Sequence, residues 1–395
     1  MAIEGTHSSA APRRIRLGMV GGGQGAFIGG VHRIAARIDD RYELVAGALS
    51  SDAARAAASA AELHIAPERA YADYAEMARR EAAREDGIDV VSIVTPNHLH
   101  GRIATAFLDA GIDVICDKPM TTTLAEALAL VDTVRRTKRL FALTHNYSGY
   151  PMVRQAREMV AAGELGEIRV IQAEYPQDWL STDLESTGQK QAAWRVDPAQ
   201  AGAGGSLGDI GSHAEHLARF ITGLELAQVS ADLTTFVAGR RLDDNCHVML
   251  RYANGARGML WSSQVAPGNE NALRVRIYGS KAGLAFSQEN PNQLWFTPLG
   301  ARPQVITRGG AGAGSAAGRA TRIPAGHPEG YLEGFAQLYR DVAEQIQARW
   351  ERRAPDPLAC WVPTAEDGAR GMKFIDAVVE SSRAEGRWVD ARLSL

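Results

Sequence analysis

The first 150 residues alternate short apolar runs with longer segments whose apolar residues recur at helical spacing. The apolar runs start at Ile15, Glu43, Ile88, Ile112 and Leu140, and each has the length and composition of a buried strand. Between them, Ala-rich segments such as AARAAASAAEL and LAEALALVDTV have the pattern of helices. Alternation of this kind predicts an α/β domain with a parallel sheet covered by helices on both faces.

From about Gly166 the pattern changes to strand-like segments joined by short turns, namely IRVIQAEY, AQVSADLTTFV, NCHVMLRYANGARGMLWSSQV and LRVRIYG. The ANG within the third segment is a hairpin signal, so this region predicts an α+β domain with a large, mainly antiparallel sheet. A helix is expected to start near Asp209, and two long amphipathic helices near Tyr331 and Ala365. The Gly- and Ala-rich residues 309–320 are predicted to form a mobile surface loop.

The chain of 395 residues is long for one hydrophobic core, so we predict two domains, residues 1–148 and 149–395, with residues 1–13 as a disordered tail. A composition of 45% apolar and 23% charged residues is typical of a soluble globular protein. The net charge of −3 gives no reason to expect nucleic acid or a membrane as partner. Scattered cysteines and the lack of an apolar run of eighteen residues favour a cytoplasmic location.

A glycine-rich turn, GMVGGGQGAF, follows the first predicted strand and leads into a helical pattern. Gly21, Gly23 and Ala26 fit the pattern G-x-G-x-x-G/A, and Gly25 adds backbone freedom beside Gln24. Glycine permits the tight turn and lets backbone N–H groups approach a pyrophosphate at a helix N-terminus. The turn therefore predicts a dinucleotide-binding site.

The sequence leaves the choice between NAD and NADP open. An acid that binds the adenosine ribose is expected at the end of the second strand of an NAD-binding domain. Here Leu49, Ser50 and Ser51 stand at this place, and Asp52 follows one or two residues later. The two serines together with Arg55 are an alternative arrangement that could accommodate a 2′-phosphate.

The stretch SLGDIGSHAEH contains Asp209, His213 and His216 within eight residues. Carboxylate and imidazole side chains at this spacing could be metal ligands, an acid–base pair, or the polar start of a helix without chemistry. Asp209 and His213 are four residues apart, so they lie on the same face of a helix.

Together with the glycine turn, the segments IVTPNHLHGRIATAFLDAGIDVICDKPM and GAGGSLGDIGSHAEHL resemble the Gfo/Idh/MocA family of sugar and polyol oxidoreductases. The resemblance runs from about Ile15 to Trp388. It implies NAD(P)-dependent hydride transfer from a secondary alcohol of a cyclic polyol or sugar such as an inositol, a pyranose or a glycoside, in a cleft between two domains. Some relatives instead cleave glycosides by transient oxidation, elimination, hydration and re-reduction, and this remains the alternative.

The resemblance also implies roles for the chemical residues. Lys118, in a CDKP segment whose acid is one methylene shorter than in the family's E-K-P motif, would stabilise negative charge on the reacting oxygen. His213 would accept the hydroxyl proton and Asp209 would orient the substrate or the imidazole, whereas His216 is assigned to helix structure. Because Lys118 supplies the positive charge and the cysteines lie in apolar strands or distal loops, we expect no functional metal.

Further residues follow from the same resemblance. Those implied beside the cofactor are Thr95, Pro96, Asn97, His100, Asp117, Asn146, Trp194 and Arg195. The resemblance also places Tyr147 near the substrate. Further candidates for substrate binding lie on or beside segments expected to face the cleft, namely Tyr150, Gln177, Asp178, Trp179, Lys190 and His327. Relatives bury the apolar face of the second sheet between subunits, so we expect a homodimer or homotetramer.

Overall fold

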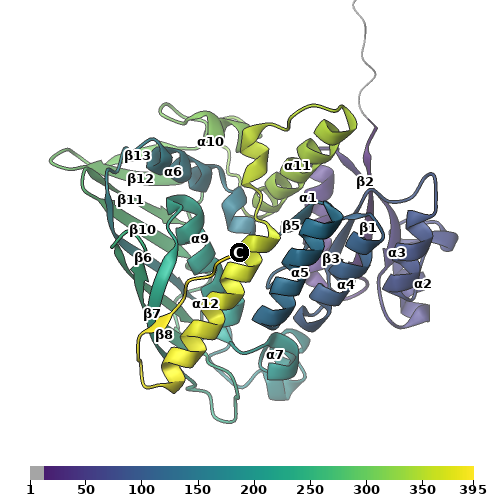
Figure 1. Ribbon diagram of the computed structural model, residues 1–395, viewed down its shortest axis with the longest axis horizontal. Helices are drawn as coiled ribbons and strands as arrows, with labels where there is room; N and C mark the ends of the chain where they lie inside the picture. Colours follow the sequence, from purple (N-terminus) through teal and green to yellow (C-terminus); the bar gives the residue numbers. More distant parts are fainter. Residues whose placement is uncertain (1–12) are drawn as a thin grey trace, which may run out of the picture.

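The computed structural model describes residues 13–395, apart from the side chains of Lys190, Gln191 and Ala193 (Figure 1). Most of the predicted N-terminal tail and the Lys190 side chain therefore lie outside the described residues. At the start of this range, the Arg13 guanidinium donates to both carboxylate oxygens of Asp89, at 2.7 and 2.8 Å. Within residues 13–395, every helix is too short or too polar for a bilayer span.

The first sheet is parallel throughout and has the strand order β2-β1-β3-β4-β5, as the alternating pattern predicted. Its strands carry near-continuous apolar runs because helices cover both faces. The strands are β1 (Ile15–Gly21), β2 (Tyr42–Ala48), β3 (Val90–Val94), β4 (Asp113–Cys116) and β5 (Phe141–Leu143). The order reverses between β1 and β3, which is where open α/β sheets bind their ligands.

Three of the helices of this first half begin at side chains that accept backbone N–H groups. Asp52 caps its helix by accepting the Arg55 amide at 2.8 Å, and Thr123 accepts the Glu126 amide at 3.2 Å. The helices are α1 (Phe27–Ile38), α2 (Ala53–Glu62), α3 (Tyr74–Ala82), α4 (Asn97–Asp109) and α5 (Leu124–Thr137).

The second sheet has the strand order β13-β12-β11-β10-β6-β9-β8-β7-β14. β6 and β9 pair in parallel, whereas the other neighbours are antiparallel, so the predicted architecture is confirmed. Strands predicted from the sequence are β6 (Ile168–Pro176), β7 (Leu226–Thr234), β8 (Asn245–Tyr252), β9 (Arg257–Ser263) and β10 (Arg274–Gly279). Strands that the sequence analysis did not identify are β11 (Ala282–Ser287), β12 (Gln293–Pro298), β13 (Gln304–Thr307) and β14 (Val389–Asp390).

One face of this sheet is covered by helices and the other is open (Figure 1). Helices of this half include α6 (Pro151–Ala161), α7 (Lys190–Arg195), α8 (Pro198–Ala201), α9 (Ser212–Thr222) and α12 (Ala365–Arg383), and two further helices are described below. On the open face, Met249, Met259 and Trp295 expose 56%, 44% and 51% of their surface.

The predicted loop at residues 309–320 is partly helical, so that prediction is wrong for its second half. Residues Ser315–Ala320 form α10, and Ala316, Ala317 and Ala320 are buried. The Gly314 amide donates to Gln155 of α6 at 2.6 Å. Small alanine side chains let α10 and α6 approach closely. The low sequence complexity of this segment gave no indication of that packing.

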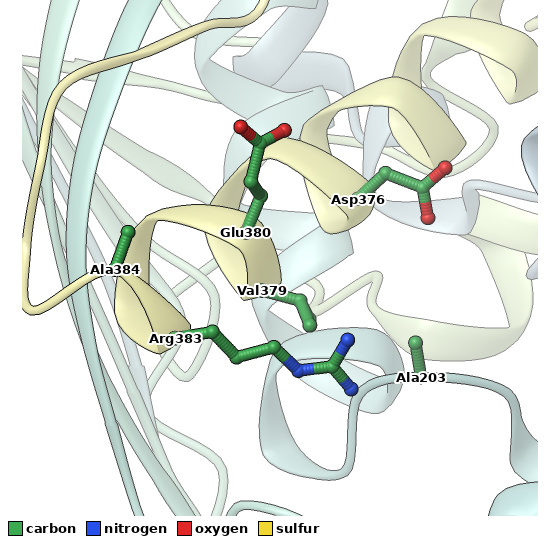
Figure 2. A pocket seen from close by; sticks show the side chains of 6 residues that line it. All are labelled: Ala203, Asp376, Val379, Glu380, Arg383 and Ala384. Atoms are coloured by element: carbon green, nitrogen blue, oxygen red, sulfur yellow. The ribbon is translucent and has the colours of Figure 1, made fainter.

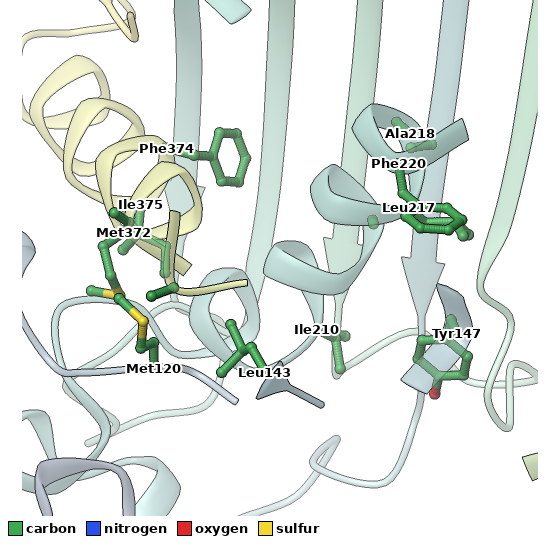
Figure 3. Close-up of a cluster of buried hydrophobic side chains, with 14 of the residues drawn as sticks. Met120, Leu143, Tyr147, Ile210, Leu217, Ala218, Phe220, Met372, Phe374 and Ile375 are labelled. Atoms are coloured by element: carbon green, nitrogen blue, oxygen red, sulfur yellow. The ribbon is translucent and has the colours of Figure 1, made fainter. Parts of the chain in front are cut away.

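The boundary between residues 148 and 149 stays a prediction, because the two halves share parts of their cores. Helix α11 (Tyr331–Trp350) packs on the first sheet, where Phe335 and Tyr339 join a cluster with Ile15 and Leu17. A larger cluster continues through both halves of the molecule. Its labelled side chains run from Met372 of α12 and the neighbouring Met120 past Leu143 to Ile210 and Leu217 (Figure 3). The apolar packing is therefore continuous between the two halves of the molecule.

Candidate functional site

The carboxyl ends of β1 and β3 supply the glycine turn and the segment Thr95–Asn97. Gly21 and Gly25 have φ values of +80° and +78°, which favour glycine over other residues. A Cβ on Gly23 would lie 2.7 Å from the Leu49 carbonyl oxygen, so this position also requires glycine. The turn therefore has the backbone geometry of a pyrophosphate cradle at the start of α1.

Two buried polar atoms at the same edge of the sheet fit a bound cofactor. In the described part of the chain, Thr95 Oγ1 and Asn146 Nδ2 are buried without a hydrogen-bond partner. Both residues line the same cavity, and buried polar atoms normally find partners, so these atoms are suited to a ligand. His100 Nε2 lies 2.8 Å from the Thr95 carbonyl oxygen, and its Nδ1 lies 2.7 Å from the Pro119 carbonyl oxygen. The buried His100 ring therefore links the two loops.

A cavity of about 870 Å³ opens at this edge, between the two halves of the molecule. It brings together most of the predicted site: Gln24, Gly25, Ala26, Thr95, Pro96, Asn97, Asp117, Lys118, Asn146, Tyr147, Gln177, Trp179, Trp194, Arg195, Asp209 and His213. An adjoining hollow of about 440 Å³ extends along the back of the glycine turn and includes Gly23 and Arg33.

Other predicted residues lie outside the cavity lining. Ser51 and Arg55 are exposed at the start of α2, beside the half-buried Ser50. Tyr150 is buried behind the wall, and its hydroxyl accepts from Gln288 Nε2 at 3.5 Å. The remaining residues are Gly21, which ends β1; His100, which is buried beneath the loops; Asp178, whose carboxylate accepts the Gly268 amide; and His327, which is exposed.

Lys118 and Asp209 meet at the centre of the cavity. The Lys118 ammonium donates to the Asp209 carbonyl oxygen and, at 3.1 Å, to its Oδ1. The other carboxylate oxygen accepts from Arg195 Nε at 3.2 Å and from Gln264 Nε2 at 2.9 Å. Lysine has three donors, so this arrangement leaves one N–H of Lys118 for a ligand.

These charges set the protonation of the site. Burial alone would raise the pKa of Asp209, but the Lys118 and Arg195 cations outweigh it and hold this pKa well below its usual range. Burial, together with the Lys118 cation, lowers the pKa of His213 well below its usual range. At neutral pH the site therefore contains an ionised carboxylate and a neutral imidazole, which is the form that can accept a proton.

A buried carboxylate fixes the segment that carries both residues. Asp243 accepts the amides of Gly205 and Leu207 at 2.6 and 2.8 Å and the Ser206 hydroxyl at 2.8 Å. A π-helical turn, Leu207–Gly211, follows and continues into α9. Turns of this type are frequent at functional sites, and the predicted helix start is found here.

The second side of the cavity is a network of neutral groups. Tyr147 and Tyr175 share a hydrogen bond between their hydroxyls, and Tyr175 donates to Asn271 Oδ1 at 2.7 Å. Gln177 donates to the same oxygen at 2.6 Å, and Gln288 accepts from Asn271 Nδ2 at 3.1 Å. Because Asn271 Oδ1 only accepts, the hydroxyl chain runs from Tyr147 to Tyr175 to Asn271. The Tyr147 oxygen is thereby left as an acceptor.

Sequence reasoning missed several residues of the site: Tyr175, Gln264, Asn271, Gln288, Tyr331, Phe335 and His145. Asn271 and Gln288 lie in no recognisable motif, and only the pairing of β6, β10 and β11 brings them together. A signal was available for His145, because it directly precedes the predicted Asn146. His216, assigned to helix structure, is buried and stacks on the His145 ring at 4.0 Å.

A separate hollow lies on α12, lined by Ala203, Asp376, Val379, Glu380, Arg383 and Ala384 (Figure 2). It contains none of the predicted site residues. Over the described residues, no group of three or more His, Cys, Asp or Glu side chains is arranged to hold a metal ion. The absence of a functional metal stays a prediction.

The parallel sheet with its glycine turn and the lysine–aspartate–histidine centre define an NAD-binding oxidoreductase. Residues 15–145 match the oxidoreductase family with an NAD-binding Rossmann fold, and residues 153–285 match the GFO/IDH/MocA C-terminal domain. The chain belongs to the Gfo/Idh/MocA family. The predictions of the family, of an NAD(P)-dependent dehydrogenase acting on CH–OH groups and of a nicotinamide cofactor are thereby confirmed.

Three similar proteins illustrate the relationship. An oxidoreductase from Sinorhizobium meliloti is 54% identical, with a TM-score of 0.87 over 96% of this chain and 100% of that one. An inositol dehydrogenase homolog from Azotobacter vinelandii, complexed with NADH and myo-inositol, is 36% identical, with a TM-score of 0.87 over 96% and 98%. Levoglucosan dehydrogenase from Pseudarthrobacter phenanthrenivorans is 30% identical over 71% of this chain and 76% of that one.

Proposed function

We propose that this protein oxidises a secondary alcohol of a neutral cyclic polyol or sugar. The observation that carries the proposal is the meeting of Lys118, Asp209 and His213 in one cavity with the unpartnered Asn146 amide. The neutral wall of Tyr147, Tyr175, Gln177, Asn271 and Gln288 supports a substrate rich in hydroxyl groups. The myo-inositol complex of the Azotobacter vinelandii homolog supports the same class.

Each residue of the centre has a defined task in this reaction. The remaining N–H of Lys118 donates to the substrate oxygen and stabilises its negative charge as the C–H bond breaks. The substrate hydroxyl donates to His213, which takes the proton. Asp209 holds the Lys118 and Arg195 cations in place. When bound, the nicotinamide cofactor accepts the hydride from the carbon that bears this oxygen.

A substrate panel tests the proposal. Inositol isomers, levoglucosan, free aldoses and glycosides are incubated with NAD or NADP, and the absorbance of the reduced cofactor is followed. Turnover of a neutral cyclic polyol or sugar is the expected result. Tight cofactor binding without turnover of any of them contradicts it. An aglycone released without net cofactor reduction supports the glycoside-cleaving alternative instead.

We infer that NAD is preferred to NADP. Asp52 lies just beyond the end of β2, where its carboxylate also caps α2, and its charge disfavours a 2′-phosphate. Asp52→Ser keeps a helix-capping hydroxyl and removes the charge. The wild type is expected to bind NADH at least tenfold more tightly than NADPH in fluorescence titrations, and D52S is expected to reduce this ratio. Tighter binding of NADPH by the wild type contradicts the inference.

We also propose that the open face of the second sheet is an interface between copies of this chain. Met249 and Met259 are paired neighbours on this face, and both are largely exposed. An apolar patch of this kind is typical of an interface. Light scattering after gel filtration is expected to show a dimer or tetramer, and Met259→Glu is expected to dissociate it. A monomeric wild type contradicts the proposal.

A further inference from the structure

Behind His213 lies a second buried imidazole that has no role in the reaction described so far. His145 follows β5, and its Nδ1 lies 3.5 Å from Nδ1 of His213. The neighbouring Thr144 and Asn146 line the cavity, whereas His145 is 4% exposed and lies behind His213. The contact therefore occupies the nitrogen of His213 that faces away from the ligand.

This contact constrains the tautomers of both rings. Two Nδ1 atoms share only one hydrogen, so one ring donates and the other accepts. His213 can take a proton from a substrate hydroxyl only if its Nε2 is free, and then its hydrogen is on Nδ1. In this arrangement His213 donates to His145, which carries its own hydrogen on Nε2.

We propose that His145 is a positioning residue that holds His213 in the tautomer with a free Nε2 facing the substrate. The proposal rests on the proposed function only through the role of His213 as proton acceptor. His145 itself is buried and does not line the cavity. Its ring is fixed by stacking on His216, with a centroid distance of 4.0 Å and an interplanar angle of 6°.

The surroundings keep His145 an acceptor of this hydrogen bond. Burial, followed by the neighbouring His216, His213, Lys118 and Arg219, lowers the pKa of His145 well below its usual range. The groups that face His213 are Lys118, Asp209, Tyr147, Tyr175 and His216, in addition to His145. A neutral His145 accepts the hydrogen bond from His213 both before and after His213 gains its proton.

Matched substitutions separate this role from simple packing. His145→Asn places an amide oxygen near the position of Nδ1, whereas His145→Leu has a similar size and offers no acceptor. His145→Phe removes the acceptor but keeps a ring that can stack on His216. His216→Phe is the control, because it keeps the stacked ring and leaves His145 intact.

The tautomer of His213 is measured directly by nitrogen NMR of histidine-labelled full-length protein, with its signal identified by its loss in His213→Asn. The wild type and H145N are expected to carry the hydrogen on Nδ1, and H145L and H145F to shift it toward Nε2. A wild-type hydrogen on Nε2, or an unchanged tautomer in H145L, overturns the proposal. If H145F does not fold, the Asn and Leu variants decide.

Kinetics with myo-inositol and NAD provide the second measurement. We expect kcat to fall about 30-fold in H145L, with KM within threefold, and to stay within fivefold of wild type in H145N. Equal losses in the Asn and Leu variants, or no loss in either, overturn the positioning role. If H213N keeps its activity, the role of His213 as proton acceptor in the proposed function fails instead, and the NMR result still decides the tautomer.

Discussion

The two sides of the cavity differ in how they use charge. Around the reacting position, Lys118, Arg195 and Asp209 form a partly buried cluster of full charges beside a neutral His213. On the second side, Tyr175, Asn271 and Gln288 offer only neutral hydroxyl and amide groups. In the proposed reaction, charge is concentrated where the reaction creates charge, and neutral groups stand where the ligand is only recognised.

The difference in charge predicts which kinetic constant each side controls. Interactions that strengthen in the transition state change kcat, whereas interactions that are equal in the bound and transition states change KM. The charged centre should therefore govern kcat and the neutral wall should govern KM. The following predictions test this division.

The largest effect is expected from Lys118→Met. The variant removes the cation that we propose donates to the reacting oxygen, and kcat should fall about 1000-fold. The carboxylate of Asp209 keeps Arg195 and Gln264 as partners, so folding and NADH binding should be retained. Steady-state kinetics and fluorescence titration of NADH measure the two quantities. A loss that appears mainly in KM would break the division between the two sides.

A smaller loss, about 100-fold in kcat, is expected from Asp209→Asn. The amide keeps the shape of the carboxylate but leaves Lys118 and Arg195 without their shared anion. Asp209 also raises the pKa of His213 against the larger effects of burial and Lys118, so its loss makes His213 a weaker base. Steady-state kinetics with the same polyol test this, and a kcat within threefold of wild type would be incompatible with the role of Asp209.

The same division explains how much the sequence could predict. The cofactor side follows from local signals, because a glycine turn and the ends of adjacent parallel strands stand next to one another in the chain or the sheet. Gln177, Asn271 and Gln288 are far apart in sequence and meet only because the end of β6 lies beside the start of β10 and the end of β11. No periodicity encodes such a meeting.

Long-range packing also limited the prediction of the fold. The amphipathic pattern from Tyr331 predicts the helix α11 but not its partner, which is the face of the first sheet formed by residues such as Ile15. Likewise, the composition of residues 309–320 does not reveal that Ala317 packs beneath α6. A pattern specifies that an element has a buried face, whereas the partner of this face depends on the whole chain.

Stability at low pH should distinguish the buried histidines behind the charged centre from the neutral wall. Burial lowers the pKa of His216 to about 3, so below pH 6.5 the unfolded chain binds a proton that the folded protein refuses, and stability falls. This single group should cost about 2 kcal/mol between pH 7 and pH 5. The loss of unfolding free energy over this range, measured by denaturant titration, should be smaller by this amount in His216→Phe. An equally steep loss in the variant would contradict the assignment.

The smallest effect is expected from the neutral wall. Asn271→Leu removes the amide that links Tyr175, Gln177 and Gln288, and KM for the polyol should rise about tenfold while kcat stays within twofold. Asn269→Leu is a matched control, because its amide donates within its own loop to the Ala266 carbonyl. Since the side-chain amide of Asn271 bonds only to neutral groups, the variant should also keep the pH dependence of wild-type stability. A kcat loss as large as that of Lys118→Met would show that the wall takes part in the chemical step, and the two sides would then act as one unit.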